Sequence, residues 1–139
     1  MSSDAIRPGL KGEIDLVVAE EHSAEHLGSG AVRVLATPQM VLLMERASVA
    51  AVDPLLPVGS CTVGAHLDIR HLEPTPIGLE VRAVAELVDV DGRQLTFRLQ
   101  VFEEPFGEDH LIGDGTHQRV IVSEQRFEER ATRKLAEAL

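Results

Sequence analysis

The sequence predicts a two-layer α+β domain, in which an antiparallel sheet packs against one apolar helix. One observation is a dense apolar run from Met40 to Val52, whose only charged residues are Glu45 and Arg46. A second is that the segments after this run alternate apolar and polar residues with the period of two typical of strands. The third is the Asp91-Gly92 dipeptide, which favours a tight hairpin and therefore antiparallel neighbours.

Local patterns predict the elements in order. Weak alternation indicates a first strand over residues 13–19, followed by a polar stretch over 20–30. Thr37-Pro38 is typical of an N-cap followed by the first helical residue, and Asp53-Pro54 should end the helix, because the residue before proline disfavours helical angles. Further strands are predicted over 62–71, 79–87, 95–101 and 113–122, and a polar helix over 124–139 should pack outside the sheet.

The alternation also predicts which residues share a face. In the last strand one set is Gly115, His117, Arg119 and Ile121. In the strand over 62–71, one set is Val63, Ala65, Leu67, Ile69 and His71, and the opposite set is Thr62, Gly64, His66, Asp68 and Arg70. His71 is therefore expected on the apolar face.

Composition restricts the function classes. The 139 residues fit one domain, 1–139, and 44% hydrophobic residues suffice for a core. A net charge of −10, with four Phe and no Trp or Tyr, argues against a nucleic-acid partner, and no apolar run approaches the roughly 20 residues of a membrane span. Residues 1–12 lack a secretory signal pattern, and a lone Cys61, expected to be an inert core thiol, favours a reducing cytoplasm.

Three residues are candidates for chemistry. Glu45 lies in the middle of the apolar helix, so it is either a perturbed catalytic carboxylate or a solvated edge residue beside Arg46. His71 is either catalytic or a hydrogen-bonded core histidine, and Thr37 is either a site residue or simply a helix cap. Thr37 and Glu45 are eight residues apart, roughly 12 Å along a helix axis, so His71 or a second subunit would have to bridge them.

Other features point to the partners. The apolar residues nearly encircle the helix, and one sheet covers only one side, so we expect at least a homodimer. None of the remaining histidines forms an i, i+4 pair on a predicted helix, and no phosphate-binding glycine loop or nucleophile-elbow motif occurs, so we expect neither a metal site nor a cofactor. The sequence contains no Asn, which excludes papain-like Cys/His/Asn sites.

Several stretches taken together resemble the hotdog-fold acyl-CoA thioesterases, specifically the fluoroacetyl-CoA thioesterase type, over almost the whole chain. They are A-T-P-Q-M-V-L-L-M-E ending at Glu45, the stretch from Val63-Gly64 to His71, T-P-I-G at 75–78 and G-D-G-T-H-Q-R ending at Arg119. The resemblance implies an antiparallel sheet wrapped around a long central helix, with sites formed across a dimer interface. Dimers that pair into tetramers are compatible with it.

The resemblance also implies roles for particular residues. Thr37, Glu45 and His71 match the family's catalytic constellation, Gly64 matches a glycine of the acyl or thioester site, and Arg119 matches an arginine close to that site. The implied reaction is hydrolysis of an acyl-CoA thioester without a cofactor. The rival interpretation is a non-catalytic hotdog protein that binds an acyl-CoA or another small apolar ligand.

One departure concerns selectivity. The fluoroacetyl-specific enzymes carry a longer, Phe-rich segment before the Thr that forms a lid, whereas residues 27–37 here are shorter and contain no aromatic residue. Selectivity for fluorine is therefore not expected.

Overall fold

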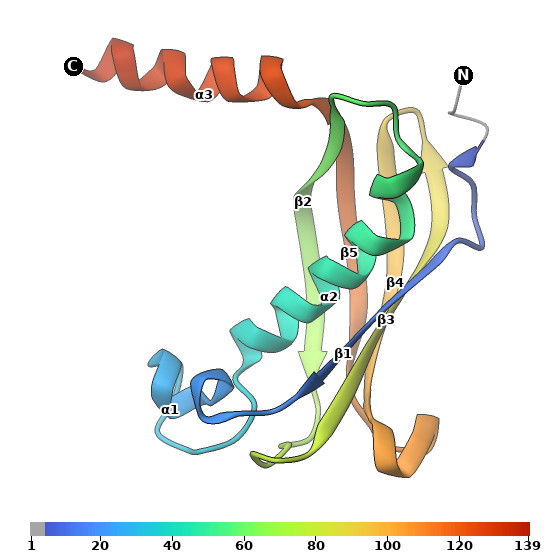
Figure 1. Cartoon of the computed structure of the whole chain (residues 1–139), viewed down its shortest axis with the longest axis vertical. Helices are drawn as coiled ribbons and strands as arrows, with labels where there is room; N and C mark the ends of the chain where they lie inside the picture. Colours follow the sequence, from blue (N-terminus) through green and yellow to red (C-terminus); the bar gives the residue numbers. More distant parts are fainter. Residues whose placement is uncertain (1–4) are drawn as a thin grey trace.

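The computed structural model describes residues 5–139 and confirms the α+β prediction, with a curled sheet around one long helix (Figure 1). Each predicted strand and helix is present, and its ends differ from the prediction by only a few residues. The elements are β1 (Lys11–Val17), the 3₁₀ turn η2 (Glu20–His22), α1 (Ala24–Leu27), α2 (Thr37–Val52), η3 (Asp53–Leu55), β2 (Ser60–His71), β3 (Glu80–Asp91), β4 (Gln94–Glu103), η4 (Glu104–Asp109), β5 (Leu111–Ser123) and α3 (Glu124–Ala138).

The sheet has five strands in the order β1-β3-β4-β5-β2, and all neighbours are antiparallel. The predicted hairpin joins β3 to β4, with Asp91 opposite Gln94 and Gly92 at a φ of 61°, so the two turn residues are Gly92 and Arg93. Although β2 and β3 follow one another in sequence, β2 pairs with β5 and lies at a sheet edge. An edge strand of 12 residues leaves a long row of backbone groups free to pair.

Helix α2 is buried along one stripe, as expected for an apolar helix that a single sheet covers on one side only. Its buried residues follow helical spacing and are Met40, Leu43, Met44, Ala47, Ser48, Ala51 and Val52. On the other side Leu42 is 45% exposed, because the sheet reaches only one face of the helix. Gly12 of β1 allows the closest approach to α2, since a Cβ there would lie 2.1 Å from the Ala47 carbonyl oxygen.

A β-bulge in β2 makes the predicted faces of this strand wrong at its start. The register with β5 shifts between Gly64 and His66, which inserts one residue and reverses the alternation. The buried Thr62 and the adjacent Gly64 therefore face α2 together with Leu67, Ile69 and His71, which come after the bulge. In β5 the predicted shared face is confirmed, because His117 and Arg119 are buried and Ile121 packs against the core.

Helix α3 does not pack on the sheet, so this expectation was wrong. It extends away from the body past the β2 edge (Figure 1), and none of its residues is buried. The Ser123 hydroxyl, which accepts from the Arg126 N–H, caps its start, and charged i, i+4 pairs such as Glu129 and Arg133 favour an isolated helix. Within residues 5–139 no helix combines the length and the apolar character needed to cross a bilayer.

Candidate active site

Thr37 and His71 meet at the start of α2. Thr37 is the first helical residue, after the N-cap position Ala36, whose side chain makes no capping hydrogen bond. The Thr37 hydroxyl instead shares a 2.7 Å hydrogen bond with His71 Nδ1 at the end of β2. Between its two alternatives, the prediction of Thr37 as a cap is therefore wrong, and its hydroxyl is free to act with the histidine.

His71 is half-buried, and burial lowers the pKa of its imidazole below the ordinary value of 6.5. Its Nε2 atom is buried, and no hydrogen-bond partner reaches it from the described part of the chain. Buried polar atoms are rarely left unpaired in folded proteins, so this nitrogen is an unusual feature of the site.

Glu45 lies two turns further along α2, opposite Gly64 of β2. Its side chain is 39% exposed, and its carboxylate pairs with the Arg119 guanidinium, with 3.7 Å between Oε2 and Nη1. A Cβ on Gly64 would lie 3.0 Å from the same Oε2 atom, so the glycine keeps the space beside the carboxylate open. Glu45 is thus partly buried, and its ion pair is with Arg119.

Arg119 is buried, with 7% of its side chain exposed, and its donors are used inside the protein. Nε donates to Thr62 Oγ1 at 2.7 Å, Nη2 donates to the Thr62 carbonyl at 2.9 Å, and Nη1 donates to His117 Nε2 at 3.1 Å. The Thr62 hydroxyl in turn donates to Asp53 at the end of α2, at 2.6 Å. Arg119 is therefore held inside the protein next to the candidate site, and its positive charge lies beside the Glu45 carboxylate.

Sequence reasoning did not single out Asp53, Thr62 or His117. Only His117 carried a signal that could have marked it as a site residue, because it is titratable and lies on the same strand face as Arg119. Asp53 could not be found, because nothing local connects the end of a helix to a guanidinium on the last strand.

The candidate residues therefore form two groups in one chain. Thr37 and His71 are hydrogen-bonded at one end of α2, while Glu45, Gly64 and Arg119 lie together further along the helix. Within residues 5–139, no hydrogen bond or ion pair connects Glu45 with Thr37 or His71.

An open pocket of about 360 Å³ adjoins the first group, and its lining includes Thr37, His71, Val32 and Leu72. None of its other lining residues is aromatic, and they are Ala24, Ser29, Gly30, Val34, Leu35, Glu73 and Pro74. A larger hollow of about 890 Å³ lies between α3 and the start of β2, but it contains none of the candidate residues. It exists because α3 projects from the sheet.

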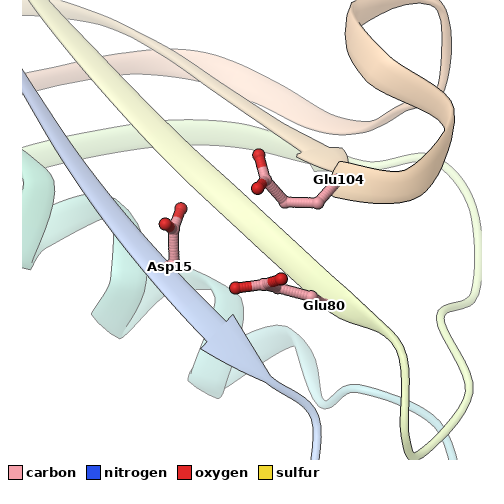
Figure 2. Close-up of side chains that lie close together, drawn as sticks. All are labelled: Asp15, Glu80 and Glu104. Carbon is pink, nitrogen blue, oxygen red and sulfur yellow. The ribbon is translucent and has the colours of Figure 1, made fainter.

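Away from this site, three acidic side chains, Asp15, Glu80 and Glu104, offer oxygens within 4.8 Å of one another (Figure 2). Arg82 explains the cluster, because its Nε lies 2.7 Å from Asp15 and 3.0 Å from Glu104. The acids hold the pKa of this arginine above its usual range, so the guanidinium is a permanent counter-ion for them.

Comparison with known proteins places this geometry in a family. The sequence profile of the fluoroacetyl-CoA-specific thioesterases matches residues 18–125. The fluoroacetyl-CoA thioesterase of Streptantibioticus cattleyicolor is 34% identical over 137 residues, which cover 94% of this chain and 96% of that protein.

Solved structures agree. A mutant of the fluoroacetyl-CoA-specific thioesterase superposes with a TM-score of 0.83 at 34% identity, covering 93% of this chain and 97% of that one. Another mutant of that enzyme was solved in complex with acetyl-CoA, and it matches with a TM-score of 0.83 at 33% identity, covering 93% and 98% of the two chains. A thioesterase superfamily member from Thermus thermophilus has a TM-score of 0.84 at 30% identity, with 96% and 98% covered. The fold is thus the hotdog fold, and this chain belongs to the fluoroacetyl-CoA-specific thioesterase family.

Proposed function

We propose that the protein hydrolyses acyl-CoA thioesters to a free acid and CoA at a site that two copies of the chain complete. The observation that carries this proposal is the hydrogen-bonded Thr37–His71 pair beside an open pocket, in a chain that also holds Glu45 opposite Gly64. Family membership supports the same reaction, since the related enzyme has been solved with acetyl-CoA. No cofactor is part of the proposal.

Glu45 supplies the nucleophilic oxygen or activates water. As a nucleophile, its carboxylate attacks the thioester carbonyl, the C–S bond breaks, and CoA leaves as a thiolate that takes up a proton. Water then cleaves the resulting anhydride and restores Glu45. As a base, Glu45 removes a proton from water, the hydroxide attacks the same carbonyl, the C–S bond breaks, and the leaving CoA thiolate takes up the proton. Both routes need a carboxylate that substrate or water can reach. The lack of a side chain at Gly64, next to Glu45 Oε2, leaves space for this.

We propose that His71, oriented by Thr37, transfers the proton that the leaving CoA thiolate takes up. A neutral imidazole can accept a proton and return it to the leaving thiolate, and the lowered pKa of His71 supports a neutral ring at pH 7. The hydrogen bond from Nδ1 to Thr37 orients the ring and leaves Nε2 for the reaction. Backbone N–H groups at the α2 N-terminus or near Gly64 are the candidate donors for the oxyanion.

A homodimer is part of the proposal, because the two groups of residues do not meet within one chain. The unpaired edge of β2 and the uncovered side of α2, with Leu42 45% and Leu67 37% exposed, support an interface along this edge. We propose that Thr37 and His71 of one copy act with Glu45 of the other. We propose that Arg119 lies close to the bound thioester and acts on it through its ion pair with Glu45. The proposed location of the protein is a reducing cytoplasm.

Thiol release from a panel of acyl-CoAs tests the function directly. We expect turnover with at least one short acyl-CoA, and binding of the panel without thiol release would instead support a non-catalytic ligand-binding protein. Mixing Glu45→Gln with His71→Ala protein tests the shared site, because heterodimers should regain activity that neither variant has alone. A stable monomer by sedimentation at micromolar concentration would contradict the shared site.

A further inference from the structure

We infer that His117 is a positioning residue that holds both groups of the active site in place, through the bulge of β2 on one side and the Arg119 guanidinium on the other. The inference rests on the proposed thioesterase function. His117 is 2% exposed in the middle of β5, and none of the chemical roles above uses it.

The hydrogen bonds of His117 define its tautomer. Nδ1 lies 2.8 Å from the carbonyl oxygen of His66, which can only accept, so Nδ1 carries the proton and donates. Nε2 is then the unprotonated nitrogen and accepts from Arg119 Nη1 at 3.1 Å. A single neutral ring therefore connects β2 with Arg119, and both of its nitrogens are satisfied.

The bond to His66 supports the geometry of the bulge. Gly64 and His71 are seven residues apart, so a regular strand would put them on opposite faces of the sheet. The extra residue between Gly64 and His66 brings both to the face that α2 covers, where His71 reaches Thr37. His117 donates to the backbone of the bulge itself, and it thereby stabilises the conformation that presents His71.

The bond to Arg119 supports the position of Glu45. Two guanidinium nitrogens of Arg119, Nε and Nη2, donate hydrogen bonds to Thr62, and the third donates to His117. This third nitrogen, Nη1, is the one 3.7 Å from the Glu45 carboxylate. Loss of the His117 acceptor would leave Nη1 without its buried hydrogen-bond acceptor and let the guanidinium and Glu45 shift together.

Three substitutions separate the two contacts. His117→Leu removes both, His117→Asn keeps a donor near the Nδ1 position, and His117→Gln keeps an acceptor near the Nε2 position. We expect His117→Leu to lower kcat roughly a hundredfold, the cost of a misplacement of about 1 Å, with KM changed less than about threefold. Asn and Gln should each restore part of kcat. His110→Gln, at the exposed residue that follows η4, is the control that keeps wild-type kcat.

Nitrogen NMR of the histidine rings gives a readout that needs no turnover. The wild-type protein should show His117 with the proton on Nδ1, and the His71 ring signals should move in His117→Leu and stay in His110→Gln. If the wild type hydrolyses no acyl-CoA, the proposed function fails while these spectra still decide the positioning role. Wild-type kcat in a folded His117→Leu protein, equal kcat losses in all three variants, or a proton on Nε2 would overturn the inference.

Discussion

Replacing Glu45 with Gln should stop turnover while the protein stays folded. The two side chains are nearly isosteric, but an amide is neither a nucleophile nor a base at neutral pH. We expect kcat to fall a thousandfold or more, which corresponds to about 4 kcal/mol of activation free energy. Thiol release under saturating acyl-CoA measures the loss, and Glu129→Gln on the exposed α3 helix is the matched control.

The stability of the same variant follows from its ion pair. Two charges about 4 Å apart interact by about 4 kcal/mol at an effective dielectric constant of about 20. Because the Glu45 side chain is 39% exposed, solvent screening reduces the net contribution to about 1 kcal/mol. Arg119 also keeps its hydrogen bonds to Thr62 and His117. The melting temperature should therefore change by no more than about 4 °C for a domain of this size. A folded variant that keeps more than about a tenth of wild-type kcat would exclude Glu45 from the reaction.

Three further results are expected. Acetyl-CoA and fluoroacetyl-CoA should differ in kcat/KM by less than about a hundredfold, some 2.7 kcal/mol, because residues 27–37 form no aromatic lid, and a larger preference would refute this. Burial lowers the pKa of His71, so below about pH 6.5 the folded protein binds fewer protons than the unfolded chain and its stability should decline. The value of kcat/KM should also fall only below that pH, and a rate midpoint above about pH 7 would disagree. Gly12→Ala should destabilise the protein by about 3 kcal/mol or more in denaturant titrations, because its Cβ would lie 2.1 Å from the rigid Ala47 carbonyl, whereas Gly30→Ala, with ordinary contacts, should be near neutral.

The amino-acid sequence by itself determined the elements and the family. Hydrophobic periodicity is a local property, so the apolar run of α2, the alternation of the strands and the turn at Gly92 could be read without tertiary information. The family resemblance picked out Thr37, Glu45 and His71 from the order and spacing of short motifs. The sequence predicted that the sheet covers one side of α2, but it could not identify that side, because apolar residues lie all around the helix.

Tertiary structure decided how these residues are arranged. The bulge after Gly64 reverses the alternation of β2, and the His66 carbonyl beside it accepts a hydrogen bond from His117, 51 residues away, a contact that no local pattern contains. Thr37 is the first residue of α2 rather than its N-cap, and its hydroxyl bonds to His71, while α3 extends from the body with none of its residues buried. Contacts between residues far apart in sequence determine which face of a strand each side chain occupies, and local alternation alone predicts this wrongly where a bulge occurs. This is the physical reason why the faces and the site required the folded protein.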